Sequence, residues 1–352
     1  MKILVTGAAG FVGFHLCRRI CGNGDEVVGI DSISDYYDPA LKYARLSELG
    51  IPRAAADSHD PAPSTRLNGF TFRRLSLEDR AAMGQLFADS PFERVFHLAA
   101  QAGVRYSIEN PHAYIQANVE GFLNILEGCR AAKTHHLVFA SSSSVYGLSQ
   151  RRPFSEHDVA DHPLSLYAAT KKSNELMAHA YSHLFGIPCT GLRFFTVYGP
   201  WGRPDMAYFK FAQAIDGGRP IELYNRGEMT RDFTYIDDAV EGLVNVMDHP
   251  PCANPDWDST NPDPASSSAP FRLYNMGNGK PEPLASLVAA LESSLGKKAQ
   301  VRLLPLQPGD VTATQADLAG LEADLGWRPA TSLEDGIASF VEWFKEYGRG
   351  RT

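Results

Sequence analysis

Short apolar segments that alternate with helical segments constrain the fold of this chain more than any other feature of its sequence. Strands are predicted at residues 2–6, 26–30, 70–74, 94–98, 136–140 and 188–193. Helices are predicted among them, at residues 11–21, 79–88, 112–131 and 164–185. Because connecting helices cover both faces of a parallel sheet, its strands are short continuous apolar runs. The alternation therefore predicts an α/β fold built on a doubly wound parallel sheet.

The pattern changes after about residue 195, where Pro and Gly become frequent and the elements shorten. Helices are predicted there at residues 206–215, 236–248, 284–294 and 333–347. Residues 51–68 and 250–270 are expected to be loops. We expect one domain at 1–195 and a smaller, irregular α/β domain at 196–352. Two parts of the second region, about 232–248 and 271–278, are expected to return to the first domain.

Charge and cysteine content argue against several classes of protein. The 352-residue chain has 33 basic and 41 acidic residues and a net charge of −8, which disfavours binding to nucleic acids or anionic membranes. No apolar run approaches the roughly 18 residues of a transmembrane helix. The five cysteines are scattered and match no metal-binding spacing. We therefore expect reduced thiols, a cytoplasmic location and no metal site.

A glycine-rich turn, TGAAGFVG, joins the first strand to the first helix. Gly7, Gly10 and Gly13 allow a tight turn and the close approach of a pyrophosphate to the helix N-terminus. An ordinary tight turn also uses glycines, but a strand before and a helix after favour a dinucleotide site. Asp31 ends the second strand, where a carboxylate binds ribose hydroxyls, and no arginine follows it directly, which favours NAD over NADP. The candidates for cofactor binding in this region are Gly7, Gly10, Phe11, Val12, Gly13, Asp31 and Ser32.

Tyr167 and Lys171 form a YxxxK pair on a predicted helix, where this spacing puts both side chains on one face. A tyrosine with a pKa of about 10 is a poor base at neutral pH. A neighbouring ammonium and an oxidised nicotinamide would favour the phenolate. An exposed Tyr–Lys pair is the simple alternative, but the dinucleotide turn upstream favours a catalytic pair.

These motifs resemble the extended short-chain dehydrogenase/reductase family, whose Rossmann-type fold binds NAD. The family places a strand-end motif near the nicotinamide ribose, and residues 97–100 (HLAA) match it. The resemblance adds Leu98, Ala99, Ala100 and Asn118 to the predicted cofactor site. The family often has an acidic residue after the third strand, whereas residues 75–77 here are Leu-Ser-Leu.

Four serines occupy the end of a predicted strand, in the stretch ASSSSVYG at 140–147. Polyserine is typical of flexible linkers, but the strand leads directly into this run. In the resembling sugar epimerases, a hydroxyl four residues before the tyrosine of this motif shares the substrate's proton. That position is Ser142, and Ser144 is a second candidate for the relay. Related dehydratases and decarboxylases carry an acid where Ser143 and Ser144 stand, and both serines are expected to contact the sugar.

The segment at 191–207, GLRFFTVYGPWGRPDMA, is similar to the UDP-glucuronic acid 4-epimerases of this family. The resemblance covers nearly the whole chain and implies UDP-glucuronate and UDP-galacturonate as substrate and product. A guanidinium binds a carboxylate through two parallel hydrogen bonds. We therefore expect Arg203 to bind the C6 carboxylate, assisted by Thr196 and the serines. A structural loop arginine is the alternative.

The resemblance also implies residues for the nucleotide and a partner. Arg231 is expected at the pyrophosphate, Gln307 and Asp310 at the ribose, Tyr208 and Phe209 near uracil, and Arg105 near the nicotinamide. Family members often form homodimers through helices that match 112–131 and 164–185. Three alternative functions stay open: a UDP-glucuronate decarboxylase, a UDP-glucose or UDP-galactose 4-epimerase, and an NAD-sensing regulator. The intact Tyr167–Lys171 pair disfavours the regulator.

Overall fold

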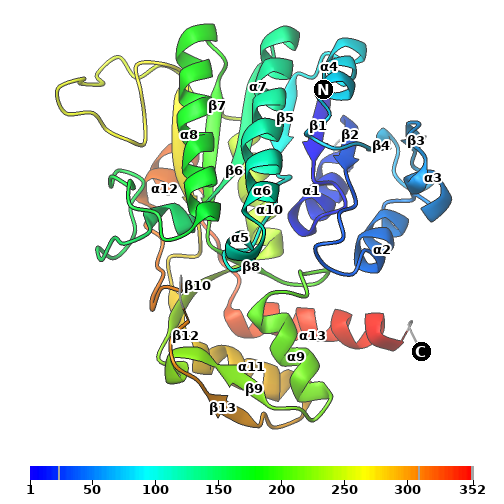
Figure 1. Cartoon of the computed structure of the whole chain (residues 1–352), viewed down its shortest axis with the longest axis vertical. Helices are drawn as coiled ribbons and strands as arrows, with labels where there is room; N and C mark the ends of the chain where they lie inside the picture. Colours follow the sequence, from blue (N-terminus) through cyan, green and yellow to red (C-terminus); the bar gives the residue numbers. More distant parts are fainter. Residues whose placement is uncertain (23, 308–309, 350–352) are drawn as a thin grey trace.

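An eight-stranded sheet forms the centre of the computed structural model, which describes residues 1–22, 24–307 and 310–349 (Figure 1). The strand order is β11-β7-β6-β5-β1-β2-β4-β3. The strands are Phe271–Met276 (β11), Cys189–Phe194 (β7), His136–Ser142 (β6), Arg94–His97 (β5), Lys2–Thr6 (β1), Glu26–Asp31 (β2), Phe70–Arg74 (β4) and Ala62–Pro63 (β3). Neighbouring strands are parallel except for β3 and β4. Because the strand order runs in opposite directions from β1, the predicted Rossmann-type, doubly wound sheet is confirmed.

Helices cover both faces of this sheet, and two apolar cores lie beneath them. The helices α4 (Arg80–Asp89), α7 (Gly121–Ala132) and α8 (Leu166–Phe185) pack in a row on one face (Figure 1). On the other face α1 (Phe11–Cys21) packs against α10 (Ile236–Met247). Both α10 and the edge strand β11 come from the second half of the chain. The division into domains at residue 195 stays a prediction.

The region between β2 and β4 is more ordered than the sequence indicated. The helix α2 (Ala40–Glu48) was not predicted, although it buries Leu41 and Leu46. The predicted loop at 51–68 contains α3 (Arg53–Asp57) and β3, so that prediction was wrong for these segments. A two-residue strand such as β3 carries too short an apolar pattern to be recognised, and it forms here because it pairs with β4.

A smaller lobe lies below the large sheet in Figure 1. It contains a three-stranded sheet in the order β12-β10-β8 and a two-stranded sheet of β13 and β9. Its strands are Thr196–Tyr198 (β8), Ile221–Leu223 (β9), Thr230–Tyr235 (β10), Pro281–Pro283 (β12) and Val301–Leu303 (β13). Its helices are Ala207–Asp216 (α9), Leu284–Leu295 (α11) and Leu333–Arg349 (α13). An aromatic and aliphatic core of its own joins these helices.

The remaining elements are short. They are α5 (Tyr106–Glu109), α6 (Pro111–Tyr114), the π-helical turn η1 (Ile115–Glu120), the 3₁₀ turns η2 (Ser143–Tyr146) and η3 (Tyr224–Gly227), and α12 (Ala319–Leu325). The helix predicted at 112–131 is therefore divided into α6, η1 and α7. A π-turn of this kind is frequent at functional sites. Among the described helices, none combines the length and apolarity needed to cross a membrane.

A buried ion pair joins α8 to the strands beneath it. Glu175 of α8 accepts hydrogen bonds from Arg193 of β7, to its Oε1 from Nε at 2.9 Å and to its Oε2 from Nη2 at 3.0 Å. The Ser141 hydroxyl of β6 donates to Oε1 at 2.7 Å. The side chains of Arg193 and Glu175 are 0% and 2% exposed. Burial acts to raise the pKa of the Glu175 carboxyl, but Arg193 holds it below its usual value, so both groups are charged.

Replacing Glu175 with Ala should strongly destabilise the protein, because Arg193 would stay buried without its counter-charge. Breaking a buried pair in this way costs about 3–5 kcal/mol in free energy of unfolding. Asp216→Ala is the matched control, since it removes an exposed pair with Lys297 and should cost less than about 1 kcal/mol. Denaturant unfolding of both variants measures the difference, and equal costs would contradict the structural role of Glu175.

Candidate active site

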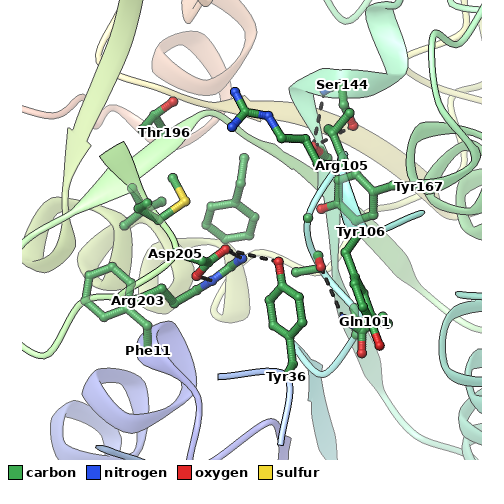
Figure 2. A pocket seen from close by; sticks show the side chains of 18 of the residues that line it. Phe11, Tyr36, Gln101, Arg105, Tyr106, Ser144, Tyr167, Thr196, Arg203 and Asp205 are labelled. Atoms are coloured by element: carbon green, nitrogen blue, oxygen red, sulfur yellow. Dashed lines mark hydrogen bonds and ion pairs between the residues drawn. The ribbon is translucent and has the colours of Figure 1, made fainter. Parts of the chain in front are cut away.

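One large cavity of about 1400 Å³ lies between the carboxyl ends of the central strands and the smaller lobe. Figure 2 shows side chains of the large-sheet domain, such as Tyr36 and Tyr167, facing Thr196 and Arg203 of the following segment. The cavity includes the ends of β1, β2 and β5, where the strand order reverses. Ligands of doubly wound folds bind at this switch point. The volume exceeds the roughly 300–1,000 Å³ of ordinary ligand pockets, so a dinucleotide and a second ligand can be accommodated together.

The glycine turn forms a cradle that only glycine fits. Gly7 has φ +76°, and a Cβ there would lie 3.0 Å from the Ala99 nitrogen. A Cβ at Gly13 would lie 2.2 Å from the Gly7 carbonyl oxygen. The Thr6 hydroxyl accepts from the backbone nitrogens of Leu98 and Ala99 at 3.1 and 3.0 Å and so holds the end of β5 beside the turn. This close packing leaves the backbone at the start of α1 open to a pyrophosphate, as NAD requires.

Asp31 lies at the end of β2 with its carboxylate already oriented. Its Oδ1 accepts from the Ile33 nitrogen at 2.7 Å and its Oδ2 from the Ala9 nitrogen at 3.2 Å. The Lys42 ammonium of α2 lies 3.5 Å from Oδ1 and also lines the cavity. Lys42 was not predicted from the sequence because α2 was not predicted. The buried residues of α2 include Lys42 and Arg45, so its inner face lacks the apolar periodicity of a helix.

Most of the predicted cofactor residues line the cavity. They are Gly7, Gly10, Phe11, Val12, Gly13, Asp31, Ser32, Leu98, Ala99 and Ala100. Asn118 is an exception, because it is buried behind the lining in the π-turn η1. Its Oδ1 accepts from the Gln101 nitrogen at 2.8 Å, and its Nδ2 donates to the Thr170 hydroxyl at 3.0 Å. Asn118 therefore positions the cavity wall at Gln101 and α8 rather than facing the cavity itself.

The predicted catalytic residues converge at one point of the cavity. Ser142, the last residue of β6, hydrogen-bonds through its side chain to Tyr167 in the first turn of α8. The Ser144 hydroxyl donates to the Ser142 hydroxyl at 2.9 Å, which gives a chain of hydroxyls (Figure 2). Lys171, one turn after Tyr167, donates from Nζ to the Ala140 carbonyl oxygen at 2.8 Å. Ser142 is therefore the serine that acts on the pKa of Tyr167, and Ser144 is linked to Tyr167 through Ser142.

Burial has the largest effect on the pKa values of Tyr167 and Lys171. It raises the pKa of Tyr167, while the Ser142 hydrogen bond and the Arg203 guanidinium act to lower it. Burial also lowers the pKa of Lys171 to about 8, with Glu175 acting in the opposite direction. Lys171 therefore keeps its proton at neutral pH and loses it a little above. A positively charged ligand beside Tyr167 would lower the tyrosine's pKa further.

The predicted sugar end of the cavity contains Thr196 on β8 and Arg203 in the loop before α9 (Figure 2). Arg203 pairs with Asp205, from Nε to Oδ1 at 3.0 Å and from Nη2 to Oδ2 at 2.5 Å. The Tyr36 hydroxyl donates to the same Oδ2 at 3.3 Å. Ser143 and Ser144 also line the cavity. Arg203 was predicted from the sequence, whereas Tyr36 and Asp205 were not, since no spacing in the chain links residues 36 and 205.

Arg231, predicted for the pyrophosphate, and Arg105, predicted as a substrate residue near the nicotinamide, both line the cavity. Arg231 lines it and donates from Nη1 to the carbonyl oxygens of Thr230 and Thr312. Arg105 pairs with Asp310, from Nη2 to Oδ2 at 3.1 Å, and both line the cavity.

The other predicted nucleotide residues lie differently. Gln307 is not part of the lining, and residues 308–309 beside it lie outside the described part of the chain. Tyr208 lines the cavity, but Phe209 does not. Phe209 packs against Phe340 and Trp343 in the core of the small lobe, so it cannot contact uracil without leaving that core. Tyr208 also packs against Phe340 and is 1% exposed, so only a small part of its side chain reaches the cavity.

A Rossmann-type sheet with a glycine cradle and a Tyr–Lys pair facing it defines an enzyme of the short-chain dehydrogenase/reductase class. Residues 3–256 match the model of the NAD dependent epimerase/dehydratase family, and the chain belongs to that family. The prediction of NAD as the cofactor is confirmed by this membership and by the glycine cradle.

Similar proteins span the whole chain. A probable UDP-glucuronate 4-epimerase of Rhizobium meliloti is 48% identical over 100% of this chain and 99% of its own length. UDP-glucuronate 4-epimerase 3 of Arabidopsis thaliana is 44% identical over 99% of this chain and 77% of its own. The crystal structure of UDP-glucuronic acid 4-epimerase from Bacillus cereus with UDP-glucuronic acid and NAD has a TM-score of 0.84 and 32% identity, over 99% of this chain and 100% of that one.

Replacing Lys171 with Met should make the stability difference between the two proteins depend on pH. The folded-state pKa of about 8 lies below the ordinary value of 10.5, so the unfolded state binds more protons between these values. The wild type should therefore gain free energy of unfolding relative to Lys171→Met between about pH 8 and 10, by roughly 1 kcal/mol per pH unit. Denaturant unfolding of both proteins across this range tests the prediction. A constant difference would mean that Lys171 is not a desolvated charge.

Proposed function

We propose that this enzyme interconverts UDP-glucuronate and UDP-galacturonate by oxidation and re-reduction at C4 of the sugar. The observation that carries the proposal is that Arg203 and Thr196 face Tyr167 in one cavity (Figure 2), whose lining also includes Ser142. A residue able to bind an acid thus lies in the same cavity as a candidate acid–base pair. The similarity to UDP-glucuronate 4-epimerases along the whole chain supports the same substrate.

Tyr167 is the group that takes the proton of the 4-hydroxyl. Ser142 holds that hydroxyl and shares the proton, and Ser144 continues the hydroxyl chain. Lys171 supplies a positive charge behind Tyr167 and is placed to bind the nicotinamide ribose. When bound, NAD⁺ supplies the acceptance and return of a hydride at C4, so that no net oxidation results. Between these steps the 4-keto sugar turns over about its link to UDP, so that its opposite face would receive the returning hydride, and Tyr167 returns the proton to the C4 oxygen.

Three of the residues predicted for the nucleotide keep this role as part of the proposal. Arg231 is the candidate for the diphosphate, because it lines the cavity. Asp310 is the candidate for the uridine ribose, with Arg105 beside it. Tyr208 is the candidate for contact near uracil that remains after Phe209 is excluded.

Purified protein incubated with UDP-glucuronate should produce UDP-galacturonate and no UDP-xylose. Chromatography that resolves the three sugar nucleotides separates an epimerase from a decarboxylase, and UDP-glucose in parallel tests a neutral-sugar epimerase. Tyr167→Phe should reduce the rate about 100- to 10,000-fold, the usual contribution of a general acid–base group. The proposal fails if the wild type converts UDP-glucose but not UDP-glucuronate, or if UDP-xylose is the main product.

The carboxylate must be protected in this reaction, because oxidation at C4 creates a β-keto acid that loses carbon dioxide readily. We propose that Arg203 holds the C6 carboxylate away from the orientation that favours cleavage. Positions 143 and 144 support this, since they are serines where related decarboxylases carry an acid. Arg203→Ala in the same assay should release UDP-4-keto-pentose. A variant that binds UDP-glucuronate normally and releases none would contradict the clamp.

We further propose that the enzyme acts as a homodimer in the cytoplasm. Exposed apolar side chains lie on the adjacent helices α7 and α8, namely Leu123, Leu176, Leu184 and Phe185, at 41–67% exposure. A second copy would bury them. The cysteines are all unpaired, which agrees with a reducing compartment. Light scattering should give twice the chain mass for the wild type and the single mass for Leu176→Glu, and cell fractionation tests the compartment. A wild-type monomer would contradict the dimer.

A further inference from the structure

Arg203 is held in place before any substrate arrives. Asp205 uses both carboxylate oxygens on one edge of the guanidinium, Oδ1 on Nε at 3.0 Å and Oδ2 on Nη2 at 2.5 Å. A guanidinium has a second pair of donors on the edge formed by Nη1 and Nη2. That second edge is the one on which a ligand carboxylate can bind. The pair is mostly buried, with side-chain exposures of 25% for Arg203 and 23% for Asp205.

Tyr36 fixes Asp205 from the other domain. Its hydroxyl donates to Asp205 Oδ2 at 3.3 Å, and the Arg203 guanidinium lies 6.0 Å from its ring centre. The loop at Gly103 leaves room for this tyrosine, because a Cβ there would lie 2.3 Å from the Tyr36 hydroxyl. Tyr36 follows β2, the strand that ends in the cofactor residue Asp31. Arg203 is therefore restrained from both sides of the cavity.

Arg203 and Asp205 are both charged, and their opposite charges nearly cancel. Burial acts to lower the pKa of Arg203, while Asp205 raises it above its ordinary value. Burial acts to raise the pKa of Asp205, and Arg203 holds it below its usual value. A substrate carboxylate thus meets directed hydrogen-bond donors rather than an unbalanced positive charge.

Arg203 and Tyr167, the residue that would hold the C4 oxygen, line the same cavity (Figure 2). The Arg203 guanidinium also acts to lower the pKa of Tyr167. An unrestrained guanidinium in this cavity has two places to bind a keto acid, the C6 carboxylate and the C4 ketone. Binding at the carboxylate and binding at the ketone have opposite effects on decarboxylation. A cation on the carboxylate stabilises the intact acid, whereas a cation at the ketone stabilises the negative charge that develops there on cleavage.

We propose that Asp205 is a positioning residue that keeps Arg203 on the carboxylate edge and so protects the keto acid from decarboxylation, with Tyr36 supporting Asp205. This inference rests on the proposed function. In the reaction that is prevented, the C5–C6 bond breaks and its electron pair forms the C4–C5 enolate. Carbon dioxide leaves, C5 takes a proton from water, and UDP-4-keto-pentose is released. The hydride removed from C4 is not returned, so one reduced cofactor remains for each molecule of this product.

Asp205→Asn tests the inference through the products. The amide cannot accept from both guanidinium nitrogens, so the share of UDP-4-keto-pentose relative to UDP-galacturonate should rise about tenfold or more. Tyr36→Phe should change it in the same direction by a smaller factor. Asp324→Asn is the matched control, because Asp324 also accepts from an arginine and a tyrosine, Arg272 and Tyr274, and does not line the cavity. The control should keep the wild-type product ratio.

A binding measurement tests the same inference without turnover. In a Tyr167→Phe background, Asp205→Asn removes the two-point hold on the Arg203 guanidinium. Because Arg203 is then no longer kept on the carboxylate edge, the affinity for UDP-glucuronate relative to neutral UDP-glucose should fall about tenfold by calorimetry. Thermal unfolding checks that each variant is folded. If the Asp205→Asn variant does not fold, the same affinities are measured with Tyr36→Phe instead.

The outcomes separate the two proposals. A wild type that makes no UDP-galacturonate contradicts the proposed function, and the affinity ratio still decides the role of Asp205. A wild type that epimerises, together with an Asp205→Asn variant that keeps the wild-type product ratio and affinity ratio, overturns the inference alone.

Discussion

The buried contact among Glu175, Arg193 and Ser141 is the interaction on which the active site depends. Glu175 lies one turn beyond Lys171 on α8, and Ser141 directly precedes Ser142 on β6. One carboxylate therefore sets the distance between the helix that carries the acid–base pair and the strand end that carries the hydroxyls. Glu175 also offsets part of the burial cost of the Lys171 ammonium. A buried pair contributes little net stability, so its value here is the geometry that it enforces.

A second buried arginine joins the cofactor turn to the substrate loop. Arg45 of α2 is fully buried and donates to the carbonyl oxygens of Ala9, Trp201 and Gly202. Ala9 belongs to the glycine turn, and Gly202 directly precedes Arg203. Together with the contact between Tyr36 and Asp205, this arrangement fixes the carboxylate-binding loop relative to the cofactor. The two ends of the cavity are thus positioned by side chains of a region that shows no catalytic motif.

Sequence reasoning succeeded where local patterns carry the information. The strands at 2–6 and 70–74 and the helix at 11–21 have the predicted bounds, because apolar periodicity and a glycine turn define them. The same holds for the residues of the glycine cradle and for the meeting of Tyr167 with Ser142. Reasoning failed where a side chain's role depends on distant partners. Asn118 holds the Gln101 backbone from behind, and Phe209 belongs to the small lobe's core.

By itself, the sequence determined the α/β class, the glycine turn and the candidates for the acid–base pair, because each depends on residues near one another in the chain. The tertiary structure alone decided how Arg203 is held. Asp205 lies two residues from Arg203 in the chain, but Tyr36, which donates to Asp205, comes from the loop after β2. Only folding brings these two loops together, with room for Tyr36 beside Gly103. The sequence gives the type of each side chain, but its charge compensation and its mobility depend on the residues that folding brings into contact with it.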